Sequence, residues 1–178
     1  MLARMRRYLA LALFAASTFS AVAQAPADPL TPLDFLTGPW IAATNTAGSS
    51  SGNVLGTYTF SRTLAGHAIE RTGTVATCKG PQDFDCNHHD RLTIFPESGA
   101  LAALYLDNEG HVIHYLITLP DPHTAVFLSQ GPPSAPKFRL TYHLEGTGPK
   151  AIMTGKFQFA PPGSDDFHSY LEWSGTKP

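Results

Sequence analysis

The densest group of possible ligands in the chain consists of two cysteines and two adjacent histidines. Cys78 and Cys86 flank a short proline-containing segment, and His88 and His89 follow it directly. Neighbouring residues of a strand point to opposite faces, and this spacing matches no zinc-binding pattern. We therefore predict a disulfide between Cys78 and Cys86, worth about 2–3 kcal/mol in the chain-entropy model, and keep a four-ligand metal site as the weaker alternative.

Motifs for catalysis are scarce in the rest of the chain. The nucleophile-elbow, zinc-protease and phosphate-loop motifs are absent, and the glycine-rich segment 146–151 lies between two strand patterns, where it predicts a hairpin turn. Two of the carboxylates of Glu70, Asp90 and Asp107 could form a catalytic pair if the fold brings them together. Their positions in the sequence do not indicate such a pair. The sequence thus gives little support for an enzyme.

Arg71 is a candidate for ligand binding. It lies on the same face of its predicted strand as Ile69 and Val75, because the three residues are separated by even numbers of positions. Arg71 could therefore be an inward-facing charge that binds a carboxylate head group. The alternative is an arginine near the mouth of a barrel whose head group reaches water.

Antiparallel strands must position these residues. The segment Asp90–Pro120 contains three apolar runs separated by two turn sequences, 96–99 and 107–110, that each end in glycine. Type I turns closed by a residue with positive φ have this pattern, so the segment predicts a three-stranded meander. Its strands Ala100–Leu106 and His111–Leu119 are apolar on both faces, which points to a homodimer contact or a covering helix.

Turn signals recur along the whole chain at a spacing of about eight to twelve residues, and the 15 glycines and 15 prolines favour turns over helices. We predict an all-β fold, an antiparallel up-and-down barrel of about ten strands with a short helical turn at Thr31–Leu36; a two-sheet sandwich is the alternative. The expected strands are Trp40–Thr46, Asn53–Arg62, Ala68–Thr77, Asp90–Phe95, Ala100–Leu106, His111–Leu119, Thr124–Gln130, Lys137–Leu144, Lys150–Phe159 and Phe167–Trp173.

The N-terminal residues have the three parts of a secretory signal peptide. Three arginines precede an apolar run that ends before Ala21-Val22-Ala23, and the run is shorter than the roughly 20 residues that span a bilayer. We expect residues 1–23 to be removed, 24–31 to form a flexible leader and 32–178 to form one domain. Its destination would be the periplasm in a double-membrane bacterium and the exterior otherwise. Cleavage leaves nine basic and 14 acidic residues, a net charge of about −5, which disfavours nucleic acid and anionic lipid as partners.

The segment Leu33–Trp40, LDFLTGPW, resembles the opening turn of lipocalin-like, or calycin, barrels. The expected strand number is similar to the fatty-acid-binding and nitrobindin branches, and SRTLAGHAIER at 61–71 looks like secreted, uncharacterised bacterial lipocalin-like domains. The resemblance implies a barrel that encloses a small apolar molecule. It also implies His168 as a weak candidate for a haem ligand, because nitrobindin-like proteins carry that histidine on the last strand. Strict alternation with Phe167 and Leu171 would instead point His168 outward.

Three functional classes remain. The first is a non-enzymatic binding protein for a small apolar or amphipathic ligand. The second is a filled barrel that acts as a protein-interaction module. The third is an enzyme or a haem protein. Small residues in the wall such as Gly155 and Gly73 would leave room for the ligand, and a phenylalanine at Gly155 would fill it unless the glycine marks a close approach. The expected cavity residues are Trp40, Tyr58, Arg71, Phe138, Tyr142, Phe157, Phe159 and Trp173.

The first prediction concerns processing. We expect the exported protein to begin at Gln24 and to contain no free thiol, because the cleavage site is followed by a single possible cysteine pair in an oxidising compartment. Intact-mass analysis with and without reduction measures both. Two alkylatable thiols in the unreduced protein would contradict the disulfide.

Overall fold

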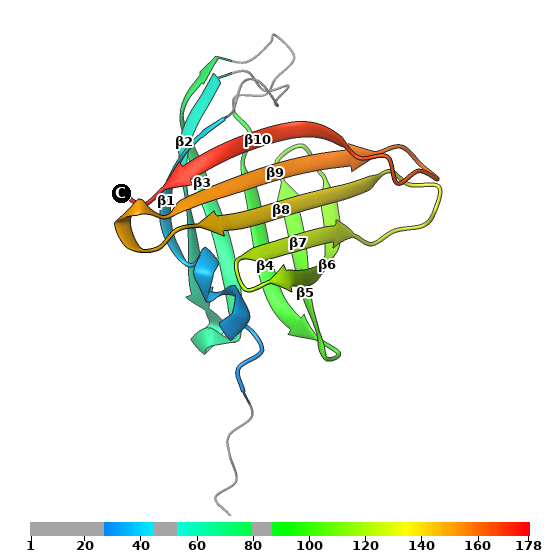
Figure 1. Cartoon of the computed structure of the whole chain (residues 1–178). Coiled ribbons are helices and arrows are strands. Elements are labelled where there is room, and N and C mark those ends of the chain that lie inside the picture. The colour runs from blue at the N-terminus through cyan, green and yellow to red at the C-terminus, as the bar shows by residue number, and fades with distance from the viewer. Residues whose placement is uncertain (1–26, 45–52, 80–86) are drawn as a thin grey trace, which may run out of the picture.

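The computed structural model describes residues 27–44, 53–79 and 87–178, without the side chains of Asn53 and 76–79. Its strands form a closed antiparallel barrel in which every strand pairs with its neighbours in the sequence and β1 also pairs with β10 (Figure 1). The predicted fold class is confirmed. The predicted signal peptide and Cys86 lie outside the described residues, as does the side chain of Cys78.

The strands begin and end within a few residues of the predicted positions. A 3-10 turn, η1 (Thr31–Leu36), precedes the first strand, and two shorter ones, η2 (Leu64–Gly66) and η3 (Gly148–Lys150), lie in turns. The strands are β1 (Gly38–Thr44), β2 (Asn53–Thr63), β3 (Ala68–Lys79), β4 (Asp90–Glu97), β5 (Ala100–Asp107), β6 (Val112–Asp121), β7 (Thr124–Ser129), β8 (Lys137–Glu145), β9 (Ile152–Ala160) and β10 (His168–Thr176).

The two turns of the central meander differ in type. Gly110 has φ 91° and its N–H donates to the carbonyl of Asp107, as expected for a type I turn closed by glycine. The turn between β4 and β5 is tighter, because Glu97 pairs with Ala100 and both Ser98 and Gly99 have positive φ. A two-residue turn of this kind matches the twist of the flanking strands better than the predicted type I turn does.

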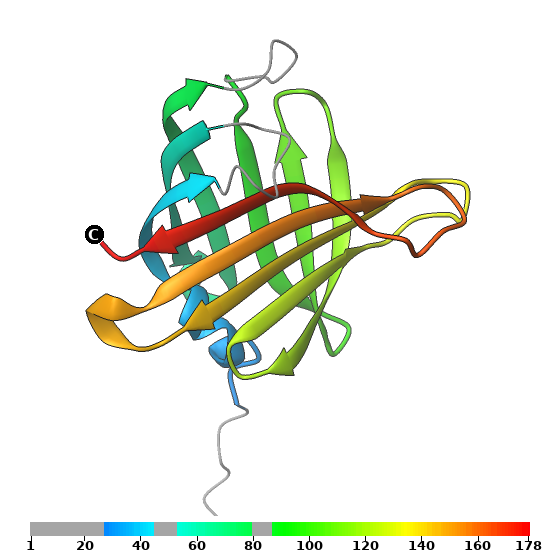
Figure 2. The same cartoon turned by 45° about the horizontal axis from the view of Figure 1, so that its top comes forward.

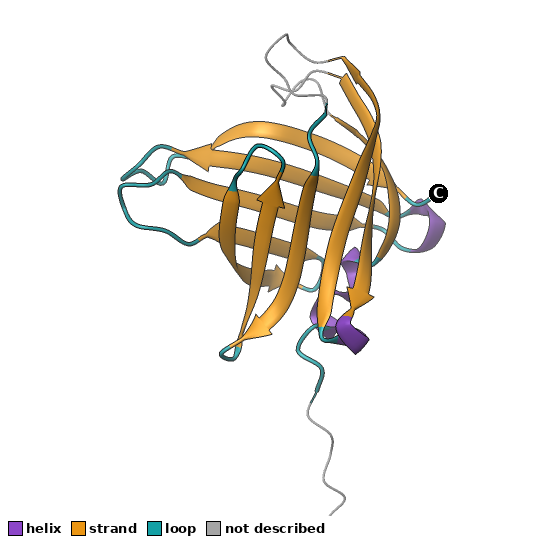
Figure 3. Ribbon diagram, turned by 180° about the vertical axis from the view of Figure 1, so that it is seen from behind, coloured by secondary structure: helices purple, strands orange, loops and turns teal. Residues whose placement is uncertain are grey.

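One end of the barrel is closed by the segment that contains η1, and Figure 3 shows this turn beneath the strands. Leu30, Leu33 and Leu36 are fully buried, and the indole N–H of Trp40 donates to the Leu36 carbonyl at 2.9 Å. Leu30 belongs to the segment expected to be a flexible leader, so the ordered fold begins before Pro32. We call the opposite end, where β4 begins and β5 ends, the mouth.

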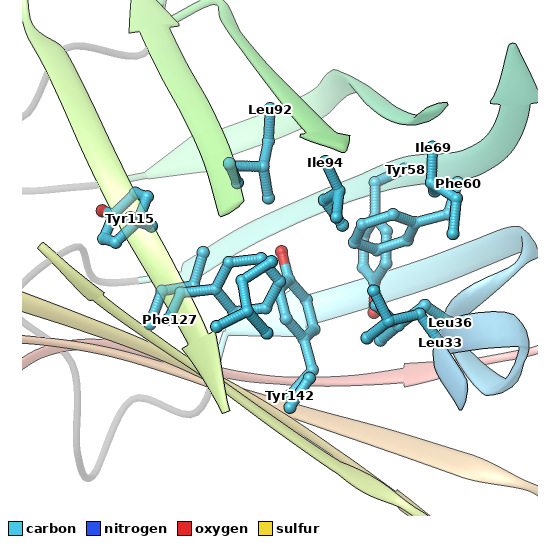
Figure 4. Close-up of a cluster of buried hydrophobic side chains, with 14 of the residues drawn as sticks. Leu33, Leu36, Tyr58, Phe60, Ile69, Leu92, Ile94, Tyr115, Phe127 and Tyr142 are labelled. Atoms are coloured by element: carbon cyan, nitrogen blue, oxygen red, sulfur yellow. The ribbon is translucent and has the colours of Figure 1, made fainter. Parts of the chain in front are cut away.

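Aromatic side chains fill the middle of the barrel. Tyr142 is fully buried, and its ring lies 5.3 Å from that of Phe60, 5.9 Å from Phe127 and 5.6 Å from Trp173, centroid to centroid. Figure 4 shows Tyr142 among the inward side chains of both walls. These rings divide the interior into a closed lower half and an upper half towards the mouth.

A β-bulge in β10 changes which side chains face inward. Ser169 pairs with Gln158 but Leu171 pairs with Phe157, so one extra residue lies in β10 between them. Beyond the bulge His168 pairs with Phe159, which places His168 on the same side of the sheet as Phe159. Strict alternation placed His168 on the opposite side, and the bulge is the reason for the difference.

Gly155 does not line an empty space. An ideal Cβ at this position would lie 2.0 Å from the indole of Trp173, because the indole packs directly on the glycine backbone. The idea that a phenylalanine here would fill a void is therefore wrong, and the glycine marks a close approach.

The second prediction compares Gly155 with Gly73, where an added Cβ would make ordinary contacts at 3.5 Å and longer. We expect Gly155→Ala to lower the free energy of unfolding by about 3 kcal/mol, because Trp173 must move out of a packed position. Gly73→Ala should change it by less than about 1 kcal/mol. Denaturant titration of both variants measures this, and equal effects would contradict the packing described here.

Candidate functional site

Arg71 is an inward-facing charge in the middle of the barrel. It pairs with Phe60 on β2 and Leu92 on β4, which are both buried core residues, so it lies on their face of the sheet. Its Nη2 forms an ion pair with Asp90, and its Nη1 donates to the hydroxyl of Tyr142 at 2.8 Å. Because Tyr142 lies on β8, this hydrogen bond joins two walls of the barrel.

Asp90 is held in its ionised form. Burial alone would raise the pKa of this carboxyl, but Arg71 and His88 outweigh the burial and hold the pKa at about 2. Asp90 therefore balances the charge of Arg71 throughout the physiological pH range.

His88 connects this ion pair to solvent. Its Nε2 lies 3.6 Å from Asp90 and 3.0 Å from the hydroxyl of Tyr105, and its Nδ1 lies 2.9 Å from Glu109. The Asp90 carboxylate, partly opposed by burial and supported by Glu109, raises the pKa of His88 to about 9. A protonated imidazole donates from both nitrogens, which fits acceptors on both sides.

Asp107 occupies the position opposite Asp90 on the neighbouring strand. Like charges at facing positions repel, and here each carboxylate has its own partners. Asp107, whose side chain is 3% exposed, accepts hydrogen bonds from the hydroxyl of Tyr105 and from the backbone N–H of His111, and its Oδ2 lies 2.8 Å from Nδ1 of the His111 ring. Burial opposes ionisation, but the hydrogen bonds from His111 lower the pKa of Asp107.

We refer to Arg71, His88, Asp90, Tyr105 and Tyr142 as the inner polar cluster. Two buried polar atoms have no hydrogen-bond partner among the described residues: Arg71 Nε, within the cluster, and the hydroxyl oxygen of Tyr58, which lies next to Gly175 on β10. Burial, and the neighbouring Tyr142, raise the pKa of Tyr58, so its hydroxyl stays neutral. Such groups cost free energy unless a partner reaches them.

The inward apolar residues near the mouth are less buried than those near η1. Val75 is 39% exposed, and Phe138, Phe157 and Leu171 are only partly buried although they pack against the core. These residues lie on β3, β8, β9 and β10, and Figure 2 shows the ends of these strands around the mouth. Apolar side chains at this end of the barrel are therefore partly in contact with solvent.

The structure brings most of the expected cavity residues together, in two layers. Trp40, Tyr58, Tyr142 and Trp173 belong to the buried core, and Phe138 stacks on Phe157 nearer the mouth with centroids 5.8 Å apart. Phe159 lies on the rim, where its side chain is 38% exposed. Of the three carboxylates considered for catalysis, Asp90 and Asp107 face each other, whereas Glu70 forms an outward ion pair with Arg91 at 3.0 Å.

Sequence reasoning missed the role of His88 and Tyr105. His88 was considered only as a metal ligand with Cys78 and Cys86, and Tyr105 only as part of a strand that is apolar on both faces. Tyr105 lies two residues after Ala103, on the same face of the strand. This spacing could have placed the Tyr105 hydroxyl inside the barrel. Among the residues that the structure describes, no cluster of three or more side chains has the arrangement of a metal site.

His168 does not form a buried axial site for haem. Its side chain is 55% exposed, and its Nε2 lies 3.4 Å from Asp166 in an ion-pair contact at the surface. A haem ligand of the kind that the resemblance implies needs this nitrogen to face a sheltered pocket. The described surroundings of His168 do not fit that group.

The chain matches no protein-family model and no curated protein. Its closed ten-stranded antiparallel barrel is compatible with a calycin or lipocalin-like fold. In the described part of the chain no helix has the length and apolar character needed to cross a membrane.

The third prediction concerns pH. His88 has a pKa of about 9 in the folded protein against 6.5 in the unfolded chain, so its contribution to stability is complete below pH 6.5 and is lost as the pH rises to 9. We expect the free energy of unfolding to fall by about 1–2 kcal/mol over this window, since solvent at a partly exposed side chain weakens the full effect.

His88→Gln should remove most of this pH dependence. His89→Gln is the matched control, because His89 is the exposed neighbour of His88. Urea titrations between pH 6 and 10 measure the effect. The same slope in wild type and His88→Gln would contradict it.

Proposed function

We propose that this protein is an exported lipocalin-like protein that binds a small amphipathic molecule in the upper half of its barrel. The observation that supports this most directly is the combination of partly exposed inward apolar side chains with a buried polar cluster that has unpaired atoms. Binding sites for small molecules commonly have an apolar lining and a few convergent polar groups.

The η1 segment closes one end of the barrel, and inward apolar side chains towards the mouth are only partly buried, which fits a ligand that enters from that side. The apolar part of the ligand would contact Phe157 and Leu171, which are only partly buried. Its polar part would reach Arg71, whose Nε has no hydrogen-bond partner among the described residues. Export to the periplasm or the exterior is the expectation from residues 1–23.

A second candidate, a protein-interaction module or homodimer, rests on the outer face of β5, β6 and β7. Large apolar side chains are exposed there: Leu106, Val112, Leu116 and Leu128. Contiguous apolar surface of this kind favours contact with another protein. The two functions use different faces and are compatible.

The fourth prediction tests ligand binding. We expect an environment-sensitive apolar fluorophore to bind the wild-type protein, and Gly73→Phe to weaken its binding at least about tenfold, because the new ring would occupy the inner face of β3 beside Tyr58. Thr72→Phe is the matched control, since Thr72 is exposed on the outer face of the same strand.

Fluorescence titration gives the affinities, and thermal unfolding of each variant establishes that the fold is retained. A wild-type protein that binds no apolar probe would contradict the proposed function. Equal losses in the two variants would place the probe outside the barrel.

A further inference from the structure

We propose that the polar end of the ligand is an uncharged hydrogen-bond acceptor, such as the carbonyl of a ketone, ester or amide, and not a carboxylate. This inference rests on the proposed function and adds the chemical class of the ligand. It replaces the expectation from the sequence that Arg71 binds a carboxylate head group.

The first reason is that Arg71 already has its counter-ion. Asp90 pairs with Nη2 from the adjacent strand, and both side chains are largely buried, with exposed fractions of 12% and 19%. A buried ion pair of this kind is electrically neutral as a unit. The remaining capacity of Arg71 is a hydrogen-bond donor, not an unbalanced positive charge.

The second reason is the charge around the pair. Two further carboxylates, Asp107 and Glu109, lie on the same side of the barrel, and Glu109 faces the protonated His88. Arg71 and His88, the two cations of the inner polar cluster, therefore each already face a carboxylate. A ligand carboxylate would add a buried charge without a partner, which is far more costly than burying a carbonyl.

The third reason is the identity of the unpaired donor. Arg71 Nε is buried and has no hydrogen-bond partner among the described residues, although Nη1 and Nη2 of the same guanidinium are both used. An N–H group can be satisfied only by an acceptor atom. A single carbonyl oxygen satisfies it without disturbing the Asp90 pair, whereas a bidentate carboxylate would have to displace Asp90.

The experiment compares three ligands of equal size that differ in the head group: methyl nonyl ketone, decanoate and a branched hydrocarbon with the same number of heavy atoms. Each competes with the bound fluorophore at pH 8, where decanoate is ionised. We expect the ketone to displace the probe at least about tenfold better than decanoate and better than the hydrocarbon.

Asp90→Asn should reverse the order of ketone and decanoate, because it leaves Arg71 without a counter-ion. Glu70→Gln is the matched control, since Glu70 forms the outward ion pair with Arg91 on the same two strands and its loss should leave the order unchanged. Thermal unfolding of each variant establishes folding. If Asp90→Asn does not fold, the double variant Arg71→Met, Asp90→Leu removes both charges and should bind ketone and hydrocarbon equally well.

The outcomes separate the two proposals. Decanoate that binds wild type as well as the ketone does would overturn this inference and leave the binding function intact. An unchanged order in Asp90→Asn, or a ketone preference that survives the double variant, would also overturn it. A wild-type protein that binds neither the probe nor any of the three ligands would overturn the binding function itself.

Discussion

The burial of the Arg71 guanidinium inside a closed barrel imposes a requirement on the surrounding strands. A buried charge without a partner is strongly unfavourable, so the neighbouring strand must supply a carboxylate at a fixed height, and Asp90 provides it at the first residue of β4. Asp90 in turn holds His88 in its protonated form, and His88 reaches Glu109 at the surface. Charges therefore alternate in sign from the middle of the barrel to solvent.

The two halves of the barrel differ in how tightly their inward side chains are packed and in how polar they are. Near η1, leucines and aromatic rings are packed to complete burial, and in the middle of the barrel the indole of Trp173 occupies the place of a side chain at Gly155. Near the mouth, the inward side chains are partly exposed and the polar cluster begins. The closed half can provide most of the hydrophobic stabilisation, which leaves the open half free to carry polar groups and accessible apolar surface.

The sequence predicted the fold well because the strands depend on local signals. Alternation and glycine turns gave ten strands close to their observed bounds, and the turn ending at Gly110 followed from its residues alone. Two kinds of feature could not be predicted from the sequence. The bulge at Ser169–Leu171 shifts the alternation without any glycine or proline to mark it, so the orientation of His168 was misjudged. The link from Arg71 to Tyr142 joins opposite walls, and such a contact depends on barrel closure and on register, which no single segment specifies.

The inner polar cluster is difficult to explain as a device for stability alone. Well-packed apolar residues can often replace a buried ion pair without loss, and sometimes with a gain, of folding free energy. Here Arg71 Nε and the nearby Tyr58 ring's hydroxyl also have no hydrogen-bond partner among the described residues, which adds a further cost. Costs of this kind are concentrated at functional sites, where a ligand can offset them on binding. Because Asp90 and Glu109 already face the positive charges of Arg71 and His88, the ligand that offsets these costs most completely is one that contributes an acceptor atom and no charge.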